Sequence, residues 1–294
     1  MNNNQLRVLS DIELSQLHDC LVKILKDFIF VCEKHNLKYT LGGGSVLGSV
    51  RHKGFIPWDD DLDINMPRED YEKFKELFAM ELAEEYDLRV PNSEYGFSTL
   101  FMKLLKKGTT YKQQFSYGDS DPTYIWIDIF PFDNVPENKV VRTLKGYIST
   151  AMAYVFVSRY IYEHRNQSTD EYYTTVKDGT LYKIRLLLAR CLPFSSKTLY
   201  NFFDRFIRHE KHTSLITCAT GRKHYLGECI DSRYFTEAED GVFEEIPVKL
   251  PYHYKEYLTQ LYGDYMQIPP VEKREHHFTT GFEIRDDVKF KCNK

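Results

Sequence analysis

Apolar and polar positions divide the chain into a front part of alternating helices and strands and a middle part that is mostly helical. Residues 11–35 place apolar side chains at helical spacing and predict a long helix, which Ser10 or Asp11 caps. Short apolar runs predict strands at 38–41, 62–66, 99–105 and 124–130, with helices at 44–52 and 67–85 between them. This order predicts an α+β head in which a mixed β-sheet carries flanking helices.

The pattern changes after Pro136. Residues 137–213 are mainly helical in pattern, residues 225–250 return to short strand-like pieces, and residues 251–262 predict a helix that ends at Gly263. We therefore expect a core at residues 1–136, a mainly helical insertion at 137–224, and a C-terminal segment at 225–294 that packs back on the core. No linker rich in Pro, Gly or Ser marks either border.

Four aspartates crowd one short stretch, at Asp59, Asp60, Asp61 and Asp63. Residues two apart on a strand face the same side, so Asp61 and Asp63 project together. Carboxylates held this close repel each other unless a cation or a proton lies between them, and carboxylate oxygens suit Mg²⁺. Taken alone, the cluster also fits an acidic turn in solvent.

A third acidic position favours the metal interpretation. In WIDIFPFD, residues 126–133, Asp128 stands between two isoleucines, so its side chain leaves an otherwise apolar strand. Asp133 competes for this role, but it follows Pro131 and is interpreted as a turn residue or a helix cap.

A glycine turn precedes the aspartates. Residues 42–44 are glycines that end a strand, and Ser45 begins a short helix. Glycine lets a backbone approach a ligand closely, and the free N–H groups of a helix start favour phosphate. No Gly-Lys-Ser/Thr follows, so this is not a P-loop. Arg51, His52 and Lys53 come next, and each either contacts phosphate or belongs to a basic surface turn.

Two further basic residues are candidates for phosphate binding. Lys103 lies among apolar neighbours on a predicted strand, where an ordinary edge-strand lysine is the alternative. Arg274 follows a Pro-Pro pair and could bind phosphate with both guanidinium nitrogens. His276 and His277 are adjacent and point different ways in extended chain, which favours a packing role over a zinc site.

Composition narrows the class of partner. The formal net charge is −4, so no overall basic field attracts nucleic acid. The six cysteines form no C-x-x-C pair, which favours free thiols in a reducing compartment. The N-terminus has no apolar signal core, so we expect the protein to be located in the cytoplasm. Residues 181–194 are apolar with three basic residues. They fit either a helix lying on a membrane or, as the favoured alternative, a core helix with exposed basic residues.

Three stretches of this chain resemble the motifs of the LicD family, which includes bacterial phosphocholine transferases and fukutin-related ribitol-phosphate transferases. They are GGGSVLGSVRHKGFIPWDDDLDINMPREDYEKF, WIDIFPFD and LYGDYMQIPPVEKREHH, and they run from about residue 38 to residue 277 around a divergent middle. The resemblance implies a nucleotidyltransferase-like fold in which residues 1–136 form the catalytic core.

The resemblance also implies roles for individual residues. Asp61, Asp63 and Asp128 would be catalytic, and together with Asp59 they would bind one or two Mg²⁺ ions, or Mn²⁺. Asp128 is also the candidate acceptor of the proton from the attacking hydroxyl. The phosphate-binding candidates are Gly43, Gly44, Ser45, Arg51, His52, Lys53, Lys103 and Arg274.

The expected reaction moves a phospho-alcohol group, with phosphocholine favoured, from a CDP-linked donor such as CDP-choline to a glycan hydroxyl and releases CMP. The acceptor would be a lipopolysaccharide, teichoic acid or capsule glycan, free or lipid-linked, at the inner face of the plasma membrane, with peripheral membrane contact as an option. One alternative is a nucleotidyltransferase that uses a nucleoside triphosphate and releases pyrophosphate. Another is a non-catalytic protein of the same fold that binds glycan or nucleotide.

Overall fold

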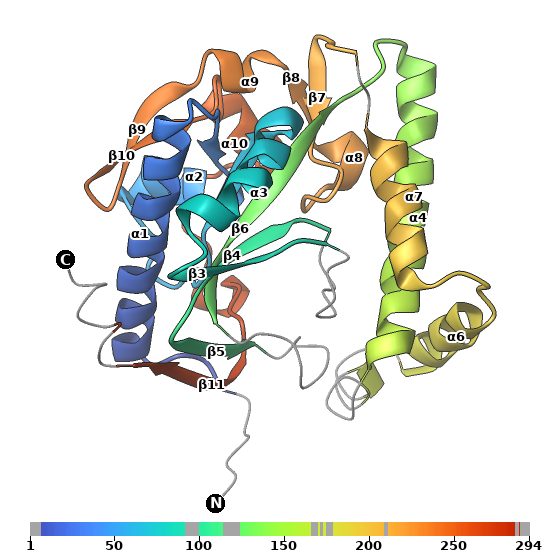
Figure 1. Ribbon diagram of the computed structural model, residues 1–294, viewed down its shortest axis with the longest axis horizontal. Coiled ribbons are helices and arrows are strands. Elements are labelled where there is room, and N and C mark those ends of the chain that lie inside the picture. The colour runs from blue at the N-terminus through green and yellow to red at the C-terminus, as the bar shows by residue number, and fades with distance from the viewer. Residues whose placement is uncertain are drawn as a thin grey trace, which may run out of the picture.

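A seven-stranded mixed sheet lies at the centre of the molecule (Figure 1). The computed structural model describes residues 7–91, 100–113, 124–165, 170, 173–174, 179–208, 211–285 and 288. The sheet has the strand order β1–β2–β6–β4–β3, and β7 and β8 extend it from β6. Within the described strands of this sheet, β2 and β6 are parallel and the other pairs are antiparallel. The strands are β1 (Thr40–Leu41), β2 (Asp63–Pro67), β3 (Tyr86–Arg89), β4 (Met102–Lys106), β6 (Ile125–Asn134), β7 (Leu215–Thr217) and β8 (Cys229–Asp231).

Helices α1 (Asp11–Lys34) and α3 (Arg68–Glu81) lie across one face of this sheet (Figure 1). The start of α1 is a capping box in which the Ser10 hydroxyl and the Glu13 carboxylate each accept a backbone N–H from the other residue. The apolar stripe of α1 is buried in the main core, as its helical spacing predicts. The short helix α2 (Gly43–His52) follows β1 directly, so the chain turns from strand to helix at the glycines.

The middle of the chain is helical, as predicted. Helices α4 (Lys139–His164), α6 (Gly179–Arg190) and α7 (Ser196–Ile207) form the side of the molecule at the right of Figure 1. A small second core with Val135, Phe203 and Tyr225 joins α7 to the end of β6. No helix among the residues that the structure describes is long and apolar enough to cross a bilayer.

The C-terminal part returns to the front of the chain. Strand β11 (Thr279–Ile284) pairs with β5 (Thr109–Gln113), a pairing that the sequence did not reveal. Besides the predicted strand-like pieces, the part from residue 224 to 250 also forms two one-turn helices. The remaining elements are α8 (His224–Gly227), α9 (Arg233–Thr236), β9 (Glu239–Phe243), β10 (Ile246–Leu250), α10 (Tyr254–Tyr262) and the 3-10 turn Val271–Lys273.

Strand β6 continues past its predicted end at residue 130, which changes the interpretation of Asp133. Its carboxylate is buried within the strand and accepts two hydrogen bonds from the Arg68 guanidinium, at 2.9 and 2.7 Å. The prediction of a turn residue or cap is therefore wrong, because this acid holds the start of α3 against the sheet. Strand β7 also pairs with this end of β6, although it lies within residues 137–224. The division of the chain at residues 136 and 224 stays a proposal.

Candidate active site

The strand register places three predicted site residues in one row across the sheet. Asp63 on β2 is paired with Asp128 on the parallel strand β6, and Asp128 is in turn opposite Lys103 on β4. Paired residues on neighbouring strands project from the same face, so the two carboxylates and the ammonium group lie side by side. The Lys103 Nζ is 3.0 Å from the Asp128 Oδ1 and 4.0 Å from the Trp126 ring centroid.

Apolar neighbours fix the direction of these acids. Ile64, Ile127 and Ile129 are completely buried, so the intervening positions of β2 and β6 must face the other side. The Asp128 N–H donates to the Leu62 carbonyl at 2.9 Å, which continues the parallel ladder one residue before β2 begins. The alternation of apolar and acidic residues therefore explains the position of the acidic pair.

Burial and mutual repulsion raise the pKa values of these carboxyl groups. For Asp63, burial raises the pKa well above its usual range, and the nearby charges of Asp61 and Asp128 raise it further. Burial also raises the pKa of Asp61 to about 6 and that of Asp128, although Lys103 opposes the shift at Asp128. The pKa of Asp59 is raised by burial and by Asp61. A divalent cation would favour the ionised form of all four groups.

The glycine turn lies directly against these carboxylates. Gly43 has a φ of +40°, and a Cβ atom there would lie 2.7 Å from the Asp63 Oδ2. A Cβ atom at Gly44 would lie 3.0 Å from the Asp59 Oδ2. The Ser45 hydroxyl accepts the Asp63 N–H at 2.9 Å, which ties α2 to β2. Glycine is therefore needed here for close approach as well as for backbone conformation.

A cavity of about 400 Å³ lies over the start of α2 and is lined by Asp59, Asp61 and Asp63, but not by Asp128. The C-terminal segment forms its opposite wall, with Tyr257 and Tyr262 from α10 and Arg274 beyond it. The Gly43 N–H donates to the Tyr257 hydroxyl at 3.0 Å, so this wall touches the helix start. The predicted site residues that line the cavity are Gly43, Gly44, Arg51, Asp59, Asp61, Asp63 and Arg274.

The basic candidates divide into two groups. Arg51 donates to the Tyr265 carbonyl at 2.7 Å, and the Arg274 guanidinium lies 4.0 Å from the Trp58 ring centroid, so both are held at the cavity wall. His52 and Lys53 are not part of that wall, and Lys53 is exposed at the end of α2 with a φ of +65°. Lys103 reaches the site through its ion pair with the Asp128 carboxylate.

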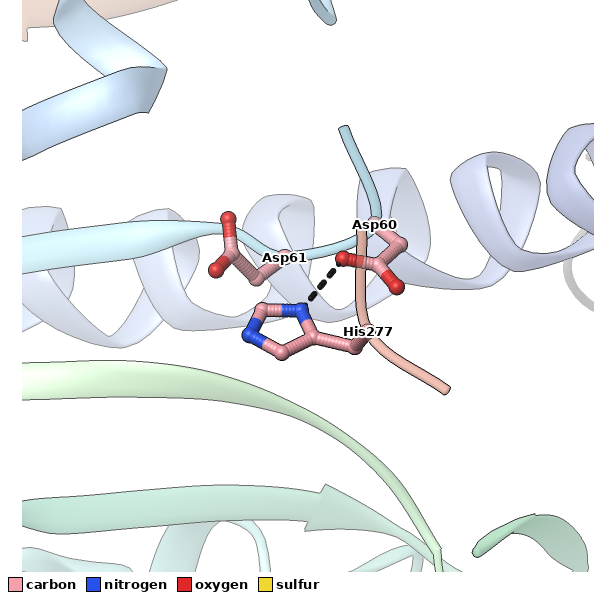
Figure 2. A group of neighbouring side chains, drawn as sticks. All are labelled: Asp60, Asp61 and His277. Carbon is pink, nitrogen blue, oxygen red and sulfur yellow. Dashed lines mark hydrogen bonds and ion pairs between the residues drawn. The ribbon is translucent and has the colours of Figure 1, made fainter. Parts of the chain in front are cut away.

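Asp60 has a role that the sequence did not disclose. Its two oxygens accept from the Tyr111 hydroxyl at 2.6 Å and pair with the His277 Nδ1 at 2.7 Å. Figure 2 shows the His277 ring beside Asp60 and Asp61, with one ring nitrogen directed at Asp60. Ligand atoms of these three residues lie within 4.8 Å of one another. Among the residues that the structure describes, this is the group whose spacing could hold a metal ion, and the predicted set of Asp61, Asp63 and Asp128 does not meet that spacing. The hydrogen bond to Asp60 raises the pKa of His277 to about 9.

Long-range contacts explain why the sequence did not reveal the group of Asp60, Asp61 and His277. His276 is exposed, whereas His277 turns inward, so the expectation that the two histidines point different ways is confirmed. His277 meets Asp60 because the C-terminal segment folds back beside the front of the chain, as the pairing of β11 with β5 shows. No local sequence pattern encodes such a contact.

The cavity wall also contains an acid that the sequence did not single out. Glu228 lines the cavity together with Tyr257, and burial raises the pKa of its carboxyl group to about 7. Glu228 is far from the aspartates in sequence and joins them only at this wall. Hydrophobic periodicity carries no signal for its position.

A mixed sheet with a glycine turn at a helix start and carboxylates on adjacent parallel strands defines a nucleotidyltransferase-like class of protein. Comparison with known proteins shows which family this part of the chain resembles. A model of the LicD/FKTN/FKRP nucleotidyltransferase domain matches residues 36–170. Residues 36–170 of this chain therefore resemble the nucleotidyltransferase domain of the LicD family.

Two named relatives are similar over different shares of the chain. The lipopolysaccharide cholinephosphotransferase LicD of Haemophilus influenzae is 29% identical over 275 residues, which are 90% of this chain and 95% of that protein. The human ribitol 5-phosphate transferase FKRP is 29% identical over 126 residues, which are 42% of this chain and 22% of that protein. Both relatives carry the name of a transferase.

Proposed function

We propose that this protein is a Mg²⁺-dependent transferase that moves a phospho-alcohol group, with phosphocholine favoured, from a CDP-linked donor to a hydroxyl of a cell-surface glycan and releases CMP. The main support for the proposal is the pairing of Asp63 with Asp128 on adjacent parallel strands. Asp63 lines the cavity together with Asp59 and Asp61. The names of the two relatives support phospho-alcohol transfer, and the match to the family model supports the fold.

The chemistry of the predicted donor atoms supports a hard divalent ion. Oxygen ligands from Asp61, Asp63 and Asp128 suit Mg²⁺ or Mn²⁺, and the raised pKa values of these groups reflect burial and a repulsion that a cation would relieve. When bound, the ion would neutralise the diphosphate of the donor and polarise the attacked phosphorus. Asp60, Asp61 and His277 are the alternative group, and both groups share Asp61.

The other residues would orient the two substrates. Arg51 and Arg274 lie at the cavity wall, where a guanidinium can bind phosphate oxygens. The turn at Gly43 and Gly44 brings the backbone of α2 close to the carboxylates, so a phosphate there would meet the positive end of the helix dipole. Asp128 is our candidate to accept the proton of the attacking hydroxyl.

The proposal extends to the acceptor and its location. We propose a lipopolysaccharide, teichoic acid or capsule glycan as acceptor, and the cytoplasmic face of the plasma membrane as the place of reaction. The name of the Haemophilus relative supports a lipopolysaccharide acceptor.

Donor turnover tests this function. Purified protein is incubated with CDP-choline and acceptor glycan, with Mg²⁺ or with EDTA, and CMP is measured. We expect CMP release that EDTA abolishes and that Asp61→Asn and Asp63→Asn remove, whereas Asp240→Asn, an exposed control, retains it. Release of pyrophosphate from CTP would instead identify the nucleotidyltransferase alternative. Unchanged turnover in the two site variants would refute the metal assignment.

A further inference from the structure

Helix α4 exposes a row of apolar side chains. Val140, Leu144, Tyr147 and Ile148 are 76%, 60%, 67% and 39% exposed. Their spacing of four, three and one residues puts them on one side of the helix, where a surface helix normally carries polar residues. An exposed apolar row of this kind marks an interaction surface.

The apolar surface continues from α4 to α7. A groove of about 850 Å³ between the two helices is lined by Ile148, Met152 and Val155 from α4 and by Phe202 from α7. Phe202 is 52% exposed and contacts the ring of Phe194, which is 47% exposed, edge to face at 5.9 Å. The surface therefore reaches the turn that follows α6.

Helix α6 is exposed as well. Leu181, Leu187 and Leu188 are 64%, 62% and 64% exposed, and Ile184 is 49% exposed. The favoured expectation for residues 181–194, a core helix, is wrong for these side chains. We call the exposed apolar residues of α4, α6 and α7, together with Phe194, the apolar helical face.

The charge of these helices differs in sign from that of the whole chain. Helices α4, α6 and α7 contain nine lysines and arginines but only two acidic residues, whereas the chain has a net charge of −4. The two acids, Glu163 and Asp204, already pair with Arg159 and Arg68. Among the described residues, no acidic group lies within 4.0 Å of four exposed basic side chains, which are Lys183, Arg190, Lys197 and Arg205.

This combination of apolar and basic groups selects one kind of partner. A second copy of the chain would bring like charges together at the same face. Nucleic acid would leave the exposed leucines without apolar contacts. A bilayer with anionic phospholipids satisfies both features, because acyl chains accept the apolar side chains and headgroups accept the basic ones.

We propose that the apolar helical face binds the surface of a bilayer that contains anionic phospholipids. The helices would lie in the headgroup region without crossing the membrane. Helix α4 begins five residues after β6 ends, so this contact would also orient the strand that carries Asp128. The inference does not depend on the proposed function, since lipid binding needs no catalysis.

Vesicle flotation of the full chain tests the inference. We expect the protein to float with vesicles of phosphatidylcholine and phosphatidylglycerol and to remain behind with phosphatidylcholine alone. The double variant Lys183→Gln, Arg190→Gln should bind anionic vesicles at least about tenfold more weakly, since each basic residue contributes about 1 kcal/mol near such a surface. Leu187→Glu with Leu188→Glu should also abolish flotation.

A matched control uses exposed apolar residues elsewhere. Ile12 and Met80 are 73% and 70% exposed on α1 and α3, so Ile12→Glu with Met80→Glu adds the same charge away from the face. Equal loss in this control would overturn the inference, as would absence of flotation in the wild type. A lipid-free dimer that Leu187→Glu disrupts would show that a second copy covers the face. A wild type that turns over donor yet does not float would overturn this inference alone.

Discussion

The cavity and the apolar helical face depart from ordinary protein structure in opposite ways. In the cavity, carboxylates that normally lie in water are held beside a packed sheet. On the helical face, leucines that normally lie in a core are exposed. The crowded carboxylates repel one another in the isolated chain, and the exposed leucines leave apolar surface in contact with water, so each departure indicates a partner. For the cavity we propose a divalent ion with a diphosphate, and for the helices a lipid surface.

The largest loss of activity is expected from substitution of Asp63. Asp63→Asn should lower donor turnover on the order of 10³-fold, because a charged ligand at the reacting centre is lost. In EDTA the same variant should unfold at a higher temperature than the wild type, because it removes a repelled carboxylate. The difference in unfolding temperature between Asp63→Asn and the wild type is measured by thermal unfolding with and without Mg²⁺. A lower unfolding temperature in EDTA would contradict the repulsion argument.

Gly43 tests whether the backbone of the cavity requires glycine. Gly43→Ala should cost roughly 1–2 kcal/mol of stability, because its φ is +40°. It should also lower turnover about 10²-fold, because the new Cβ displaces the Asp63 carboxylate. Gly281→Ala is the control, since its Cβ would meet only the Lys112 side chain at 3.8 Å. Equal losses in both variants would refute the steric explanation.

The raised pKa of Glu228 predicts that the stability of the protein depends on pH. Burial raises its pKa from 4.5 to about 7, so the folded state holds a proton that the unfolded state has released between these values. Stability should therefore fall by about 3 kcal/mol as the pH rises through this window. Glu228→Gln should flatten that part of the profile, measured by urea unfolding at a series of pH values across the window. If the unfolding free energy of Glu228→Gln falls with pH as steeply as that of the wild type, other groups cause the pH dependence.

The smallest change in stability is expected from a substitution on the apolar helical face. Leu187→Gln should change the free energy of unfolding by less than about 0.5 kcal/mol, because the side chain is already exposed. Leu62→Ala, in the main core, should cost about 3 kcal/mol. The difference between the unfolding free energies of the two variants is measured by urea unfolding. A large cost at Leu187 would show that the residue is packed in solution.

Local patterns predict much of the fold and part of the site. The spacing of apolar residues predicts α1 and the helical middle, and the isolated acid between Ile127 and Ile129 predicts the direction of Asp128. Contacts between distant segments are not encoded locally. The pairing of β5 with β11 brings His277 to Asp60, and the end of β6 extends to Asp133, whose carboxylate Arg68 binds.

Calorimetry of metal binding tests whether Asp63 helps to hold a divalent ion. Mn²⁺ is titrated calorimetrically into the wild type, Asp63→Asn and His277→Ala, each with and without CDP-choline. The proposed ion site predicts that the wild type binds Mn²⁺ more tightly when CDP-choline is present and that Asp63→Asn loses this binding while His277→Ala keeps it. Equal Mn²⁺ affinity in the wild type and Asp63→Asn would contradict it.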